Sequence, residues 1–220
     1  MTFSLAGRCA RTGMLGAVIA TSSPAVGARC VYARAGLGVV LTQNRTDPRL
    51  GPRGLALLEG GCSPAEVVAG LVGSTGLAGW RQLAVLDARG VGAHFSGEMI
   101  QSVHAGVVGV DCVAAGNILR NDTVPAAMVA AFEEGAGMDL PERLLGALEA
   151  GDRAGGEVAA LRSSAMVAVW REAFAYVDLR VDWSEAPIGA LRGVWEAYAP
   201  EADLYVTRAV EPGAAGPPSA

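Results

Sequence analysis

The sequence contains no lysine, because all 17 of its basic residues are arginines. A chain without lysine cannot form a Schiff base through a side chain, hold a nucleotide phosphate with a P-loop lysine, or use lysine as a general base. These classes of chemistry are therefore excluded, whatever the fold.

Residues that bind metals are few and scattered along the chain. The four cysteines, Cys9, Cys30, Cys62 and Cys112, form no CxxC pair, and only two histidines accompany them. Because no spacing typical of a metal site is present, we predict neither a metal nor another cofactor. Single cysteines among alanine, glycine and valine are typical of buried, reduced thiols, so we predict a cytoplasmic protein.

The charge balance and the hydropathy pattern argue against two kinds of partner. The chain has 22 acidic residues and a net charge of −5, which argues against nucleic acid as the main partner. No uncharged apolar run reaches the roughly 18 residues of a membrane span, so we expect no membrane partner. The apolar stretch Met14–Ala20 mimics part of a signal peptide, but it is short and contains Gly16, so we expect no cleaved leader.

Length and composition indicate one folded domain. Apolar residues make up 51% of the chain and charged residues 18%, which is typical of a protein with a packed core. The 30 glycines indicate many tight turns. We predict a single domain over residues 1–210 and a disordered tail over residues 211–220, where proline, glycine and alanine predominate.

The order of the expected elements favours an α+β fold. Strands are expected at Thr2–Cys9, Leu15–Thr21, Gly36–Thr42, Gln82–Asp87, Val91–Phe95, Val107–Ala115, Ser163–Trp170 and Tyr176–Asp182. Helices are expected at Arg49–Glu59, from the cap Ser63 to Val72, at Thr123–Glu134, at Pro141–Ala150 with Gly151 as C-cap, and in a last helix capped by Ser184. Strands and helices come in groups rather than in strict alternation, so we predict two mostly antiparallel sheets with helices packed outside them.

Thr2 is a candidate nucleophile. Initiator methionine is usually removed before a small residue, and its removal would place a hydroxyl and a free α-amine on Thr2. An α-amine has a pKa of about 8, so part of it is neutral near neutral pH and accepts the hydroxyl proton. The apolar strand that follows would hold Thr2 in place, whereas ordinary termini fray. The alternative is an ordinary processed terminus with no catalytic role.

Segments spread along most of the chain resemble one protein family. They are Thr2–Ala6, Thr12–Gly13, Leu15–Val18, Ser22–Ala28, Ala33–Gly38, Thr42–Gly51, Arg81–Leu83, Gly116–Leu119 and Tyr176–Asp182. In this order they resemble domain-of-unknown-function family 1028 (DUF1028), whose members have an N-terminal-nucleophile (Ntn) hydrolase-like fold. The resemblance implies an Ntn-hydrolase-like αββα sandwich of two mostly antiparallel sheets between helical layers, with hydrolase chemistry.

The resemblance also implies which side chains lie near Thr2. In an Ntn-type fold the end of the second strand lies beside the terminal residue. The hydroxyls of Ser22 and Ser23 would then orient the amine or hydroxyl of Thr2, with Ser23 as a catalytic and Ser22 as a substrate-binding residue; the alternative is a turn before Pro24. Arg34 comes just before the next buried strand in the sequence, and from there it would place a positive charge that keeps the amine neutral, or else form a surface salt bridge.

Amide side chains complete the candidate site. Thr42, Gln43 and Asn44 leave a strand as a dense group of amides and a hydroxyl, which suits a polar substrate such as an amide or a peptide; the alternative is loop capping. Asn117 is expected to donate its side-chain amide to an oxyanion, unless it only forms a turn into the next helix.

Our main hypothesis is therefore an amidohydrolase that acts on a small amide, ureide or peptide through Thr2. The alternatives are a non-catalytic module that binds a small metabolite and an oligomeric structural protein. We expect a homo-oligomer, since Ntn-type sheets often assemble. A measured mass that includes Met1 would favour the two alternatives, because Met1 blocks the α-amine of Thr2.

Overall fold

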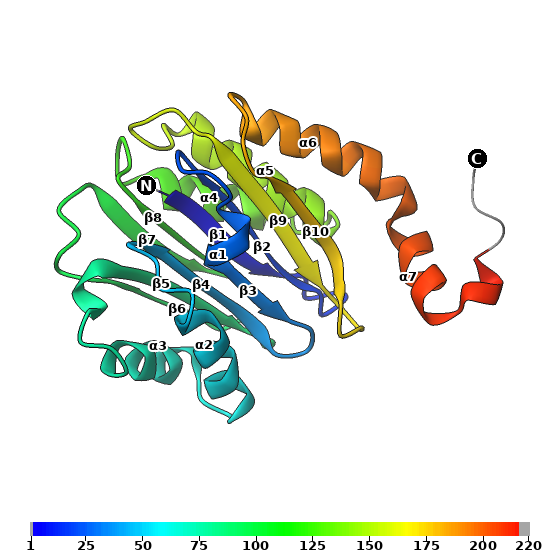
Figure 1. Ribbon diagram of the computed structural model, residues 1–220, viewed down its shortest axis with the longest axis horizontal. Coiled ribbons are helices and arrows are strands. Elements are labelled where there is room, and N and C mark those ends of the chain that lie inside the picture. Colours follow the sequence, from blue (N-terminus) through cyan, green and yellow to red (C-terminus); the bar gives the residue numbers. More distant parts are fainter. Residues whose placement is uncertain (1, 216–220) are drawn as a thin grey trace.

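The computed structural model describes residues 2–215, in which two antiparallel sheets share an apolar interface (Figure 1). The strands of the larger sheet are, in spatial order, β10 (Ala175–Val181), β9 (Ser163–Val169), β2 (Leu15–Thr21), β1 (Thr2–Arg8), β8 (Cys112–Asn117) and β7 (His104–Gly109). Those of the smaller sheet are β3 (Val31–Arg34), β4 (Gly38–Asn44), β5 (Arg81–Asp87) and β6 (Gly92–Ser96). The first strand, β1, therefore lies inside the larger sheet, with β2 on one side and β8 on the other.

Helices cover the outer face of each sheet (Figure 1). Those of the smaller sheet are α2 (Leu50–Glu59) and α3 (Pro64–Gly73), and those of the larger sheet are α4 (Val124–Glu134), α5 (Leu140–Arg153) and α6 (Pro187–Tyr198). A short α1 (Gly27–Cys30) follows β2, and α7 (Ala202–Val210) follows α6 and contacts β10. Within residues 2–215, no helix has both the length and the apolar content that a membrane crossing requires.

Alternating side chains along each strand separate the apolar layers. In β1, Phe3 and Leu5 pack with Phe132 of α4 and Leu144 of α5, whereas Ala6 packs toward the smaller sheet. The layer between the sheets consists of Ala6, Leu15, Ala17, Val39, Leu41, Ala84, Leu86, Val113, Ala115 and Val169. Since strand side chains alternate with a period of two, this layer also determines which other residues of each strand face the space between the sheets.

Most of the expected elements are present, and the start of α3 is confirmed in detail. The Oγ of Ser63 accepts a hydrogen bond from the backbone N–H of Glu66 at 3.4 Å, and the Glu66 carboxylate accepts one from the backbone N–H of Ser63 at 2.7 Å. This reciprocal pair is the capping box that the sequence predicts.

Some sequence-based expectations are wrong. The expected strand Val107–Ala115 is part of a hairpin of β7 and β8, in which the chain turns at Asp111 with a φ of +58°. Helix α5 continues through Gly151, where a Cβ would lie 2.8 Å from Cγ of Met128, so this glycine allows α4 and α5 to approach. Ser184 is not the N-cap of α6; its Oγ accepts a hydrogen bond from the backbone N–H of Ala186, which is the N-cap.

Other elements were not expected from the sequence. They are α1, β3 and α7, each short, and α7 shows that the chain continues as a helix after α6. In the expected disordered tail, Pro212–Ala214 forms one 3₁₀ turn, and residues 216–220 lie outside the described residues.

Candidate functional site

At one end of the space between the sheets, the apolar layer gives way to polar side chains. Along each strand the polar residue lies an even number of positions from a residue of the apolar layer, so it faces the same side. We call this group the polar end; it comprises Thr2 and Ser4 of β1, Thr21 of β2, Gln43 of β4, Gln82 of β5, Asn117 of β8 and Ser163 of β9. All of these residues are buried, so their polar atoms need partners within the protein or from a ligand.

Gln82 lies at the centre of a hydrogen-bond network that joins the two sheets. Its Nε2 donates to the carbonyl oxygens of Gly116 at 2.9 Å and Ala105 at 3.2 Å. Its Oε1 accepts from Nε2 of Gln43 at 2.7 Å and from Nδ2 of Asn117 at 3.0 Å. Because a carbonyl oxygen only accepts hydrogen bonds, the two backbone carbonyls determine which end of the Gln82 amide faces them.

The orientation of Gln82 determines that of its neighbours. Gln43 must present its nitrogen to Gln82, so its Oε1 is left to accept from the Ser4 hydroxyl, at 2.8 Å. Asn117 must also present its nitrogen, which leaves its Oδ1 buried without a hydrogen-bond partner in residues 2–215. One hydrogen of Asn117 Nδ2 is thus committed to Gln82, so one remains to donate to an oxyanion, and Oδ1 is an additional acceptor.

Thr2 lies at the start of β1, between the ends of two neighbouring strands. It is opposite Asn117 in the register of β1 and β8, and its Oγ1 donates to Oγ1 of Thr21 of β2 at 3.4 Å. Thr2 is 5% exposed. The structure therefore brings together Thr2 and Asn117, as the sequence predicts, and adds Thr21 to them.

A buried carboxyl group, that of Glu157, lies beside these residues. Its Oε2 accepts from the backbone N–H of Ser22 at 3.0 Å, whereas Oε1 has no hydrogen-bond partner among the described residues. Burial raises the pKa of Glu157 to about 7, while the charge of the amino terminus and hydrogen bonds with Ser22 and Thr21 act in the opposite direction. A carboxyl group in this state exchanges its proton near neutral pH.

Ser22 and Ser23 lie beside Thr21 and contact their neighbours through main-chain atoms. The N–H of Ser22 holds Glu157, and the carbonyl oxygen of Ser23 accepts from Oγ of Ser163 at 2.6 Å. The N–H of Ser23 also points to Oγ1 of Thr21, at 3.4 Å. This segment thus fixes the surroundings of Thr2 through its backbone.

Of the predicted amide group, only Gln43 faces the polar end. Strand alternation turns Thr42 and Asn44 to the opposite side of β4. There Thr42 accepts from the Thr46 hydroxyl, and Asn44 Nδ2 donates to the carbonyl oxygen of Trp80 at 2.7 Å. Thr42 and Asn44 therefore bind and stabilise the adjacent loops, which is the loop-capping alternative to a substrate-binding role.

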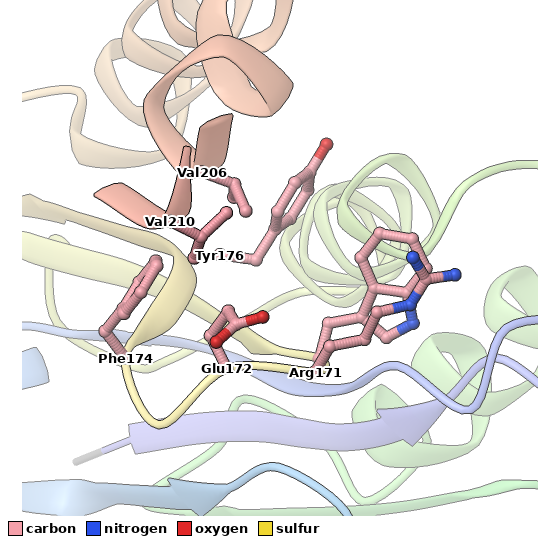
Figure 2. Close-up of a pocket in the computed structure, with 7 residues that line it drawn as sticks. Arg171, Glu172, Phe174, Tyr176, Val206 and Val210 are labelled. Atoms are coloured by element: carbon pink, nitrogen blue, oxygen red, sulfur yellow. The ribbon is translucent and has the colours of Figure 1, made fainter. Parts of the chain in front are cut away.

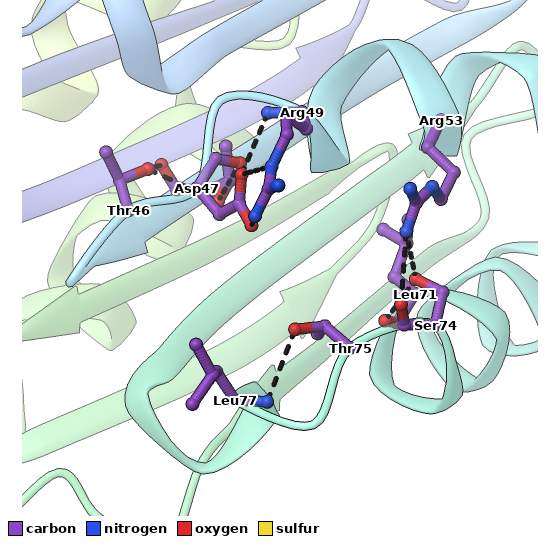
Figure 3. A network of polar contacts seen from close by, with 9 residues as sticks. Thr46, Asp47, Arg49, Arg53, Leu71, Ser74, Thr75 and Leu77 are labelled. Carbon is purple, nitrogen blue, oxygen red and sulfur yellow. Dashed lines mark hydrogen bonds and ion pairs between the residues drawn. The ribbon is translucent and has the colours of Figure 1, made fainter.

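Figure 3 shows the loop that follows β4, including Thr46 and Asp47. The Asp47 carboxylate accepts from the backbone N–H of Arg49 at 3.1 Å and from its guanidinium at 2.8 Å, directly before α2. Hydrogen bonding with Arg49 lowers the pKa of Asp47 to about 2. The polar groups of this loop thus bind one another directly before α2.

Arg34 is not brought to the polar end. It ends β3 opposite Gly38, at the other end of β4 from Gln43, and its Nη2 lies 2.5 Å from a carboxylate oxygen of Glu59. Its side chain is 45% exposed. A surface ion pair is the alternative that the sequence left open, and the geometry favours it because Arg34 is remote from Thr2.

The structure adds residues that the sequence did not single out, namely Ser4, Thr21, Gln82, Glu157 and Ser163. Four of them occupy strand positions where a polar residue alternates with the apolar layer, which is a signal in the sequence. Glu157 lies in the loop after α5 and carries no such signal. Over residues 2–215, no cluster of three or more His, Cys, Asp or Glu side chains is arranged to hold a metal ion.

An apolar hollow lies at the opposite end of the larger sheet (Figure 2). Trp170, which follows β9, donates through Nε1 to the carbonyl oxygen of Thr12, in the turn between β1 and β2. Because β1 has 7 residues, this hollow is roughly 20 Å from the polar end. The residues that line it are Trp170, Arg171, Glu172, Phe174, Tyr176, Val206 and Val210.

Comparison with known proteins identifies related chains. The family model described as "Family of unknown function (DUF1028)" matches residues 2–191. The crystal structure of protein SPO2555 from Silicibacter pomeroyi, described as a DUF1028 protein, is similar with a TM-score of 0.83 and 30% identity, over 90% of this chain and 89% of that chain. Anbu (ancestral beta-subunit) from Yersinia bercovieri gives a TM-score of 0.42 and 8% identity, over 90% of this chain and 95% of that chain. No curated protein matches.

Proposed function

We propose that this chain, which belongs to the DUF1028 family, is an amidohydrolase that attacks a small amide, ureide or peptide with the hydroxyl of Thr2. The observation that carries the proposal is the position of Thr2, at the start of the inner strand β1 and inside the polar end between the two sheets. We also propose that the fold is an Ntn-hydrolase-like αββα sandwich, because two antiparallel sheets lie between layers of helices.

The proposed reaction proceeds through an acyl-enzyme. Thr2 Oγ1 forms a bond to the carbonyl carbon of the substrate, and the carbon–nitrogen bond then breaks, so that an amine leaves and an ester remains on Thr2. Water hydrolyses this ester and restores the hydroxyl. In an Ntn hydrolase the α-amine of the same residue accepts the hydroxyl proton, which requires removal of Met1.

The polar end fixes the surroundings of this reaction. Gln43, Gln82 and Ser4 use their polar groups on each other and on backbone carbonyls, so they hold the site rigid rather than contact the substrate. Asn117 Nδ2 donates one hydrogen to Gln82 and has a second hydrogen for the substrate. Its Oδ1 accepts a hydrogen bond from a donor group of the substrate. Such preorganised groups are the main source of transition-state stabilisation in acyl transfer.

Release of amine from a set of small amides, ureides and dipeptides tests the proposed function. We expect at least one substrate to be hydrolysed, with Thr2→Ala lowering the rate by about 10³-fold or more and Thr2→Ser retaining part of it. The matched control is Thr75→Ala in the loop after α3, which should not change the rate. A Thr2→Ala protein as active as the wild type would overturn the proposal.

Binding of a small metabolite without catalysis is the second candidate, and one observation favours it. Oδ1 of Asn117 is buried without a hydrogen-bond partner in residues 2–215, so it can accept from a ligand whether or not Thr2 reacts. This function would be identified by a ligand that binds stoichiometrically and is recovered unchanged. Asn117→Ala should then no longer bind that ligand.

A further inference from the structure

The side chain of Glu157 crosses the start of β1. Its backbone forms a β-bridge with Leu119, and the N–H of Val158 donates to the carbonyl oxygen of Ile118 at 3.2 Å, so the main chain is held where β8 ends. Its carboxylate reaches the N–H of Ser22, where β2 ends. Since β1 lies between β8 and β2, the side chain passes over the end of β1 at which Thr2 lies.

A hydroxyl group connects Thr2 with this carboxylate. Thr2 Oγ1 donates to Thr21 Oγ1 at 3.4 Å, and the Thr21 side chain lies near enough to the Glu157 carboxyl to lower its pKa. The first contact is longer than the roughly 2.8 Å of a strong O–H···O bond, but contacts of this kind often shorten only when substrate binds. Glu157 also keeps Oε1 without a hydrogen-bond partner among residues 2–215, and this oxygen has lone pairs that can hold a proton.

We propose that Glu157 is the proton acceptor for the Thr2 hydroxyl, and that Thr21 passes the proton between them. This inference rests on the proposed function in one respect, namely that Thr2 is the nucleophile. The two differ in the general base, because the inference assigns this role to the Glu157 carboxylate and not to the α-amine of Thr2. The relay does not use the α-amine, so it does not require that Met1 be removed.

The step balances with the groups present. As Thr2 Oγ1 bonds to the substrate carbon, its proton moves to Thr21 Oγ1 and the Thr21 proton moves to the Glu157 carboxylate, while the carbonyl electron pair moves to oxygen. When the carbon–nitrogen bond breaks, the same proton returns through Thr21 to the leaving amine. Water then attacks the ester, and Glu157 accepts and returns one proton again, so the residue ends unchanged.

The protonation state of Glu157 suits this task. Burial raises its pKa to about 7, the charge of the amino terminus and the bonds with Ser22 and Thr21 lower it in part, and both forms are therefore present near neutral pH. Charged side chains on neighbouring segments include Arg120, Asp152 and Arg162. Arg120 donates to the carbonyl oxygen of Val158, and Arg162 lies 4.0 Å from Glu185.

Labelling of Thr2 with a small β-lactone tests the relay without knowledge of the natural substrate. The lactone ring opens on the Thr2 hydroxyl and leaves an ester, so the labelling rate reports on removal of the hydroxyl proton. The rate is measured from about pH 5 to about pH 9 on the full chain. The variants are Glu157→Gln, which keeps the shape but does not ionise, and Thr21→Val with Thr21→Ser as its rescue. Glu185→Gln is the control, because that side chain is 93% exposed.

The relay predicts a wild-type rate that rises with pH and levels off above about 7. Glu157→Gln should lose this rise and label about 10²-fold more slowly or worse, with Glu185→Gln unchanged. Thr21→Val should be labelled slowly, and Thr21→Ser should recover most of the rate. If Glu157→Gln does not fold, the comparison of these two variants tests the relay. Protein with and without Met1 should both be labelled, because the relay does not use the α-amine.

Two results would overturn the relay. The first leaves Thr2 as the nucleophile, whereas the second also contradicts the proposed function. If Glu157→Gln and Thr21→Val label Thr2 as fast as the wild type does, with the same pH dependence, Glu157 is not the proton acceptor and Thr2 remains the nucleophile. If wild-type Thr2 is not labelled at any pH while the folded protein is intact, the proposed function fails and the relay fails with it.

Discussion

Nε2 of Gln82 donates to the carbonyl oxygen of Gly116 at 2.9 Å, and this contact fixes the direction of the amides across the polar end. Gly116 belongs to β8 in the larger sheet and Gln82 to β5 in the smaller one, so the bond also ties the two sheets together. The orientation of Asn117, next to Thr2, therefore depends on a backbone carbonyl in its own strand.

Replacing Gln82 by glutamate should destabilise the protein. An ionised carboxylate cannot donate to the carbonyl oxygens of Gly116 and Ala105, and it would be buried beside them. Each buried polar group left without a partner costs about 1–3 kcal/mol, so we expect a loss of at least roughly 2 kcal/mol. Urea unfolding measures it, with exposed Gln101→Glu as the control. A loss no larger than that of the control would show that the network does not depend on the Gln82 nitrogen.

Stability should fall as pH rises through the range in which Glu157 ionises. Its pKa is about 7 in the folded protein and near 4.5 in a solvated glutamate, so the folded state holds the proton more tightly. The stabilisation is complete below about pH 4.5, is lost as pH rises toward 7, and stays lost above it, up to about 3 kcal/mol in total. Unfolding of wild type and Glu157→Gln over this range measures it. The variant should lack the slope, and an equal slope in both proteins would contradict the raised pKa.

Thr42→Val should leave the chemistry at Thr2 intact. Thr42 faces away from the polar end, and its side chain serves the loop with Thr46 and Asp47. We expect a stability loss of about 1 kcal/mol, as for other single hydrogen bonds, and an unchanged rate of β-lactone labelling. Gln43→Val is the contrast, because it should disturb the network and slow labelling. A marked loss of labelling in Thr42→Val would restore Thr42 as a site residue.

The chain after Val210 should be dispensable, whereas α7 should not. A chain ending at Val210 should melt within about 1 °C of the full chain, because its short, small-residue tail adds little packing. A chain ending at Glu201 loses the bond of Tyr176 to Asp203, at 3.0 Å, and the contact of Tyr198 with Tyr205. We expect the midpoint to fall by more than about 3 °C. Equal midpoints for all three chains would show that α7 does not stabilise the fold.

How much the sequence predicts differs between the fold and the site. The strands around Thr2 carry continuous apolar runs, so β1 and β2 are predictable, and the resemblance to DUF1028 is confirmed by the family match. The hairpin of β7 and β8 is not predictable, because the two central residues of its turn, Val110 and Asp111, are neither glycine nor proline. In β4, a strict use of alternation would have separated Gln43 from Thr42 and Asn44, since adjacent residues face opposite sides.

The remainder of the site depends on tertiary contacts. Arg34 precedes a buried strand in the sequence, but the antiparallel pairing of β3 with β4 carries it to the end remote from Thr2. Glu157 lies in a loop far from Thr2 in the sequence, and long-range backbone pairing, including the β-bridge to Leu119, brings it to the start of β1. No local pattern encodes such a pairing, so the buried carboxyl could be found only in the structure.

The mass of the peptide that carries Thr2, measured after the full chain has reacted with a small β-lactone, shows whether Thr2 is the nucleophile. We expect an adduct equal to the mass of the intact reagent, located on Thr2, slowly lost in water as the ester hydrolyses, and absent from Thr2→Ala. An adduct at one of the four cysteines alone, or a Thr2 peptide of unchanged mass in folded protein, would contradict it.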